Sequence, residues 1–192
     1  MPDFLEAETE ELALEKLHEM GCTDGLPVVI PTQERVERLI LATGLDGDMV
    51  LGEMGPGMGM ATIEKVCVAA VMAGCLPDYM PIVIAAVRAA VQPEFDLREL
   101  QATTHCTAPL IIVNGEARHS CGPVASGYGA LGPGHRANAS IGRALRLCMI
   151  NIGGGRPGIS DMALLGHLSL IHISEPTRPE RIGYGGVWVE KK

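Results

Sequence analysis

The residues best suited to chemistry lie in one polar segment, residues 101–107, whose sequence is Gln-Ala-Thr-Thr-His-Cys-Thr. Polar side chains this dense, directly before an apolar run, are costly to bury unless they are hydrogen-bonded or bind a ligand. His105 is a candidate general acid or base, because imidazole titrates near neutral pH. Thr103 and Thr104 are candidates to hold the oxygen atoms of a ligand. The alternative is a histidine whose hydrogen bonds serve only the structure.

Two cysteines are candidates for thiol chemistry. Cys106 follows His105, but neighbouring side chains of an extended segment point to opposite faces, so adjacency alone does not activate this thiol. Cys121 lies in the segment His-Ser-Cys-Gly at residues 119–122, which carries soft metal ligands, but their spacing matches no standard zinc pattern. We therefore predict no metal site. The predicted catalytic residues are His105, Thr104, Cys106 and Cys121.

The six cysteines of the chain are expected to be reduced thiols, since they include no Cys-x-x-Cys pair and no spacing typical of a disulfide framework. Cys67, Cys75 and Cys148 lie inside apolar helical patterns. Cysteine in such a position behaves as a small hydrophobic residue, so we predict that these three thiols are buried.

Two glycine-rich loops, Gly55-Pro56-Gly57 and Gly132-Pro133-Gly134, each precede an apolar helical pattern. The first N–H groups of a helix are unpaired and lie at the positive end of its dipole, so such a loop favours a carboxylate or phosphate. The alternative is that the glycines serve turns and helix packing. The predicted substrate-binding residues are Thr103, Asn114, Gly132, Gly134, His135, Arg136, Asn138, Gly55, Gly57 and Thr62.

The two loops are also the start of an apparent repeat. Gly-Pro-Gly at residues 55–57 is followed by Ala61-Thr62-Ile63, and Gly-Pro-Gly at residues 132–134 is followed by Ala139-Ser140-Ile141. This pattern is typical of an internal duplication with a pseudo-twofold axis. Chance similarity between two glycine-rich helix starts is the alternative.

The spacing of apolar residues indicates the helices and strands that position these candidate residues. We predict helices at residues 5–20, 33–42 with Thr32 as N-cap, 61–73 and 79–91, and short strands at residues 28–30, 50–51 and 110–113. The helix at 61–73 is apolar on nearly all faces and should be buried. The pattern favours an α/β or α+β layered domain, with apolar helices packed on a short sheet.

Composition limits the class of protein. With 192 residues, 47% of them apolar, the chain is expected to form a packed core, which we assign to one domain at residues 24–167 after an N-terminal helix in residues 1–23. A net charge of −8 argues against nucleic acid, and no apolar run reaches the ~18 residues of a membrane span. We expect a cytoplasmic protein, and the apolar helices leave self-association as an open alternative.

The last residues differ from the rest of the chain. Residues 168–178, Leu-Ser-Leu-Ile-His-Ile-Ser-Glu-Pro-Thr-Arg, resemble a translated sequencing adapter at the end of a metagenomic fragment. On this interpretation residues 168–192 are a non-native tail, and they are left out of the prediction of the site. The alternative is an ordinary C-terminal strand and tail.

Several motifs between residues 24 and 167 resemble those of one family. DGLPVVIPTQERVERL at residues 24–39, the apolar stretch at 61–87, APLIIVNG at 108–115 and NIGGGRPGISDMA at 151–163 resemble a family of uncharacterised bacterial proteins related to the UGSC-motif (seleno)proteins. The resemblance implies thiol- or selenol-based redox activity. Ser120-Cys121-Gly122 is a partial match to the motif that gives those proteins their name.

Two functional hypotheses follow. The first is an enzyme domain that binds a small anionic substrate between the two glycine-rich loops and residues 103–105, with proton transfer by His105 or thiol redox chemistry. The second is a non-catalytic subunit for ligand binding or assembly that uses the same helix starts. The sequence identifies no cofactor.

Overall fold

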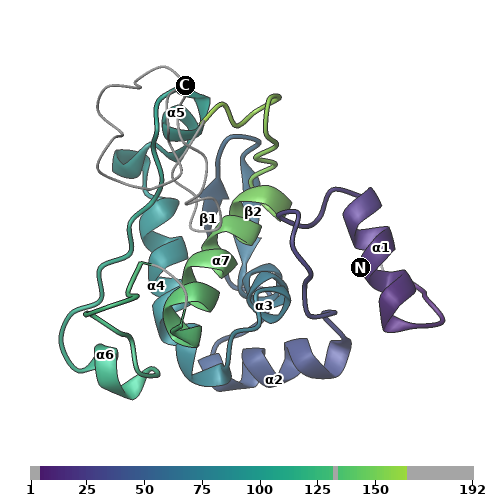
Figure 1. Ribbon diagram of the computed structural model, residues 1–192, viewed down its shortest axis with the longest axis horizontal. Helices are drawn as coiled ribbons and strands as arrows, with labels where there is room; N and C mark the ends of the chain where they lie inside the picture. Colours follow the sequence, from purple (N-terminus) through teal and green to yellow (C-terminus); the bar gives the residue numbers. More distant parts are fainter. Residues whose placement is uncertain (1–4, 132–133, 164–192) are drawn as a thin grey trace, which may run out of the picture.

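Two helices, α3 (Ile63–Met72) and α7 (Arg136–Asn151), pack against each other at the centre of the fold (Figure 1). The computed structural model describes residues 5–131 and 134–163, so the tail at residues 168–192 lies outside the described residues. The other elements are α1 (Glu10–Glu19), α2 (Gln33–Thr43), β1 (Val50–Met54), β2 (Gly59–Thr62), η1 (Pro77–Tyr79), α4 (Met80–Ala90), η2 (Pro93–Phe95), α5 (Leu97–Ala102) and α6 (Ala117–Ser120), where η marks a 3-10 turn.

Helix α3 begins at a threonine cap and is apolar on almost all of its faces. Lys65 N donates to Thr62 Oγ1 at 3.4 Å, which satisfies one of the N–H groups that a helix start leaves unpaired. Ile63 and Cys67 are fully buried, and the helix packs against α2, α4 and α7. The predicted buried helix at residues 61–73 is confirmed.

Helices α1, α2 and α4 lie close to their predicted positions. Thr32 caps α2 as predicted, since its side chain accepts a hydrogen bond from Arg35 N at 3.4 Å. Helix α1 begins later than predicted because Thr9 caps it, with Leu12 N donating to Thr9 Oγ1 at 3.2 Å. Local capping residues therefore set where α1 and α2 begin.

The strands β1 and β2 form an antiparallel hairpin. Its register pairs Val50 with Thr62 and Met54 with Gly59. This pair is the only sheet in the described residues, and the core around it is built mainly from helices. The fold is therefore α+β, in agreement with the sequence prediction. None of the described helices has both the length and the apolar character needed to cross a bilayer.

Two of the predicted strands are wrong. Residues 28–30 belong to no strand; Val29 N donates to Met72 O at 3.1 Å without a neighbouring strand. Residues 110–113 are extended but unpaired, and Leu110 and Ile112 are 66% and 73% exposed instead of buried. An apolar run indicates a segment that can form a strand, but a strand also needs a partner with free backbone groups, which the described residues do not supply here.

The described residues do not show the predicted internal repeat. The first Gly-Pro-Gly lies in the hairpin between β1 and β2, whereas residues 124–135, before α7, form irregular structure in their described part. The similarity is thus confined to glycine-rich residues before a helix. It does not extend to the elements on the N-terminal side.

An ion pair holds the N-terminal segment against α7. Arg143 Nε and Nη2 donate to the two carboxylate oxygens of Asp24, each at 2.8 Å, and Nη2 also donates to Pro27 O at 2.8 Å. Burial alone raises the pKa of the Asp24 carboxyl, but the hydrogen bond and charge of Arg143, with the backbone N–H of Leu26, outweigh it and hold this pKa below its usual value of 3.8.

We predict that Asp24→Asn lowers the free energy of unfolding at pH 7 by about 2 kcal/mol, because it removes a charge-assisted pair that is only 6% exposed on the aspartate side. Since the folded-state pKa is lowered, this contribution is present above 3.8 and is lost as the pH falls through the folded-state value. Urea denaturation at pH 7 and at lower pH measures the difference, which should shrink on acidification. The control is Asp48→Asn, at an exposed carboxyl without an ion pair among the described residues. Equal losses in the two variants would contradict the prediction.

Candidate functional site

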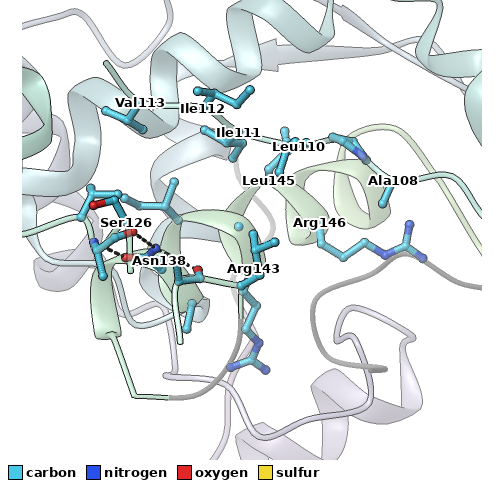
Figure 2. Close-up of a pocket in the computed structure, with 18 of the residues that line it drawn as sticks. Ala108, Leu110, Ile111, Ile112, Val113, Ser126, Asn138, Arg143, Leu145 and Arg146 are labelled. Atoms are coloured by element: carbon cyan, nitrogen blue, oxygen red, sulfur yellow. Dashed lines mark hydrogen bonds between the residues drawn. The ribbon is translucent and has the colours of Figure 1, made fainter. Parts of the chain in front are cut away.

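A cavity of about 630 Å³ lies between α7, the extended residues 108–114 and the loop at residues 124–131 (Figure 2). Its α7 wall includes Asn138, Gly142, Leu145 and Met149, whose spacing of four, three and four residues places them on one face of a helix. Leu145 and Met149 are buried. The cavity therefore has a fixed apolar wall that belongs to the core.

The opposite wall is the segment that was predicted as a strand. All seven residues from 108 to 114 line the cavity, and none of them is charged. Within residues 5–131 and 134–163, no backbone N–H or C=O group of this segment makes a hydrogen bond. Backbone groups that are closed off from water are nearly always paired in native proteins, so the unpaired groups of this partly exposed wall are open to water or to a ligand.

Asn138 fixes the third wall. Its Oδ1 accepts from Ala125 N at 2.9 Å, and its Nδ2 donates to Ala125 O at 3.0 Å and to Ala130 O at 2.9 Å (Figure 2). The amide predicted to bind an anion thus binds the main chain of residues 125–130 and holds that loop against α7. Asn114, also predicted to bind substrate, is an exposed residue of the cavity lining.

Three arginines line the cavity and differ in their partners. Arg143 pairs with Asp24, and Arg146 Nη1 donates to Asp161 Oδ2 at 2.6 Å. Arg118 is a half-buried residue, and its guanidinium has no hydrogen bond or ion pair to any described residue. Arg118 is therefore the arginine of the cavity lining whose charge no carboxylate of residues 5–131 or 134–163 neutralises.

Sequence analysis did not identify Arg118. A single arginine in the segment Glu-Ala-Arg-His, residues 116–119, has the pattern of an ordinary solvated surface residue. Only the three-dimensional arrangement separates it from Arg143 and Arg146. The one available signal was its position shortly after the apolar run at residues 110–113.

At the start of α7, two further residues that were predicted to bind an anion instead contact main-chain oxygens. Arg136 Nη2 and Nε donate to Gly74 O, beyond the end of α3, at 2.9 and 3.3 Å. His135 Nε2 lies 3.0 Å from Tyr128 O. Gly134 is exposed and does not line the cavity, and Gly132 lies outside the described residues. Anion binding by this group of residues stays a prediction.

The first glycine-rich loop packs against the turn that follows α7. Gly57 N donates to Gly153 O at 2.7 Å, and Gln101 Nε2 donates to Gly55 O at 3.0 Å. A Cβ atom on Gly153 would lie 2.7 Å from Met149 O and would also clash with Gly55 O. For this loop the contacts favour the alternative in which the glycines serve close packing.

The structure does not bring the two loops together. Gly57 contacts Gly153, beyond the last residue of α7, whereas Gly134 precedes the first. A helix of 16 residues separates them, or about 24 Å at 1.5 Å per residue. One small ligand cannot span both loops. Thr62 is likewise separate from the cavity, since it caps α3.

The predicted catalytic residues lie outside the cavity lining. Thr104, His105 and Cys106 are exposed, and His105 N donates to Thr103 Oγ1 at 3.3 Å. Cys121 is half-buried, with its Sγ 3.8 Å from Ser120 Oγ. Among the described residues, no group of three or more His, Cys, Asp and Glu side chains is arranged to hold a metal ion. The catalytic roles of these residues stay predictions.

The predicted burial of three cysteines is confirmed. Cys67 and Cys148 are 0% exposed, and Cys75 is 6% exposed. Burial raises the pKa of Cys67 to about 12, with a further contribution from the charge of Glu64. Burial also raises the pKa of Cys75 to about 12 and that of Cys148 further. These thiols are therefore almost wholly protonated at neutral pH.

Comparison of the chain with protein-family models, with curated proteins and with solved structures finds no match. The resemblance of residues 24–167 to the UGSC-related family therefore stays a prediction. The feature of the structure that bears on function is the cavity.

We predict that Gly153→Ala lowers the free energy of unfolding by about 2 to 3 kcal/mol, because the added methyl group forces the turn after α7 away from the hairpin loop. Urea denaturation measures the change. The matched control is Gly127→Ala, whose Cβ would meet nothing within 4 Å and should change stability by less than about 0.5 kcal/mol. Similar stability of the two variants would show that the close packing is absent.

We also predict that a thiol reagent at neutral pH modifies Cys106 rapidly and leaves Cys67, Cys75 and Cys148 unmodified until the protein unfolds, because buried, protonated thiols neither meet nor attack the reagent. Mass spectrometry of peptides after timed labelling identifies each site. Cys106→Ser should remove the fast phase. Rapid labelling of the buried thiols in folded protein would contradict the burial described here.

Proposed function

We propose that this domain binds a small anionic molecule with an apolar part, in the cavity between α7 and residues 108–114. The observation that carries the proposal is Arg118, a half-buried arginine without a carboxylate partner among the described residues, in a lining that is otherwise mainly apolar. Pockets of this kind, with a few polar groups in apolar walls, are typical ligand sites.

Charge supports an anion in particular. The cavity lining contains three arginines, and two of them pair with the carboxylates of Asp24 and Asp161. Three positive and two negative charges leave a net charge of +1 among the described residues. A guanidinium can bind a carboxylate through two parallel hydrogen bonds, which are stronger where water is partly excluded. The chain as a whole carries a charge of −8, so a local positive charge is a specific feature of this cavity.

The same geometry supports non-catalytic binding over the enzymatic hypothesis. His105 and Cys106 are exposed and do not line the cavity, so neither is placed to act on a ligand bound there. Proton transfer by His105, or redox chemistry at Cys106 or Cys121, is kept as the alternative proposal. A cytoplasmic location is part of the proposal and is supported by six free cysteines. Self-association is a further open alternative, supported by exposed Leu110 and Ile112.

We predict that octanoate raises the midpoint temperature of thermal unfolding. At a hundredfold excess over its dissociation constant, octanoate should stabilise the folded state by about 2.7 kcal/mol. Octanol, which lacks the charge, should shift the midpoint less. Arg118→Gln should weaken octanoate binding about tenfold, because one charge-assisted interaction is lost.

The control for this experiment is Arg88→Gln, since Arg88 is exposed on α4 and does not line the cavity. It should bind octanoate like the wild type. Equal shifts with octanoate and octanol would count against an anion site. Equal losses in the Arg118 and Arg88 variants would count against this location.

A further inference from the structure

The backbone of residues 108–114 faces the cavity. Seven consecutive residues, 108–114, line the cavity. Side chains of an extended segment alternate between two faces, so a run of consecutive lining residues shares only its backbone edge. That edge carries N–H and C=O groups that bond no other described residue. A free edge of this kind is a template for pairing with another strand.

The segment already has one of its faces held against the core. Ile111 and Val113 are half-buried and pack against the core, whereas Leu110 and Ile112 are 66% and 73% exposed. This alternation is that of a strand with one face fixed. Little further ordering is therefore needed before a second strand can pair with it.

The cavity is thus a groove between a strand edge and a helix. Helix α7 supplies the apolar face opposite the edge, through Met149 and through Leu145, which is labelled in Figure 2. Arg118 lies in α6, which follows the segment in the chain, and Figure 1 shows the chain running from α5 down to α6. The unpaired positive charge therefore belongs to the end of the groove at which residues 108–114 finish.

We propose that the occupant of this groove is the C-terminal end of an extended peptide, which adds a strand alongside residues 108–114. Its apolar side chains pack against α7, and its terminal carboxylate pairs with Arg118. A peptide that ends at α6 runs parallel to the segment. This inference rests on the proposed function and adds to it the class of ligand, because only a peptide offers donors and acceptors at the spacing of a strand edge.

The test uses the full chain and calorimetric titration with acetyl-Thr-Val-Ile-Val that has a free carboxylate. A second peptide of the same sequence that ends in an amide should bind at least tenfold more weakly, because it lacks the charge that meets Arg118. In Arg118→Gln the acid and the amide should bind equally, whereas Arg88→Gln should keep the difference. Two further peptides carry a single N-methyl group, one on the Ile nitrogen and one on the last Val nitrogen. Because the N–H groups of successive residues in a strand point to opposite edges, only one of the two should bind at least tenfold more weakly.

Four results would overturn the inference. If both N-methyl peptides bind like the parent peptide, no strand pairing occurs. If octanoate binds in an Arg118-dependent manner but the peptide does not, the proposed function stands and the peptide ligand is excluded. If sedimentation shows a dimer that the peptide cannot dissociate, a second copy of the chain covers the edge. Failure of both octanoate and peptide to bind would contradict the proposed function as well.

Discussion

The packing of α7 against α3 is the interaction on which the rest of the structure depends. Ala144, Leu147 and Cys148 have no exposed surface, and they fix one side of α7 in the core. Both ends of the helix are also held: Arg136 donates to Gly74 O at one end, and Gly153 accepts from Gly57 N at the other. Because the helix cannot shift at either end, its remaining face is a rigid wall for the cavity.

Three arginines of one cavity illustrate how partners decide what a charge does. Arg143 binds Asp24 and the main chain after it, which attaches the N-terminal segment to α7. Arg146 binds the buried Asp161 and so attaches the segment after α7. These two charges are neutralised within the fold. Arg118 has no carboxylate partner in the part of the chain that the structure describes, which is why the proposed anion site is placed at this residue.

Features set by neighbouring residues were predictable from the sequence, and features set by distant residues were not. The starts of α2 and α3 follow from Thr32 and Thr62, whose caps act within three residues. The run at residues 110–113 has the composition of a strand, but pairing depends on a partner elsewhere, and the described chain has none. The special position of Arg118 depends in the same way on where the carboxylates of the fold lie. The sequence hypothesis placed an anionic ligand at the glycine-rich loops, whereas the proposal made from the cavity places it at Arg118.

Hydrogen exchange of the backbone amides at residues 110–113, followed by mass spectrometry, tests the central claim most directly. In the free protein these amides should exchange at the rate of an unpaired chain, while the amides of α7 around Leu147 remain protected, because only the latter are hydrogen-bonded in the core. Protection of residues 110–113 equal to that of α7, in protein shown to be monomeric, would mean that this edge is already paired. That result would contradict the account of the cavity as an open groove with a free strand edge.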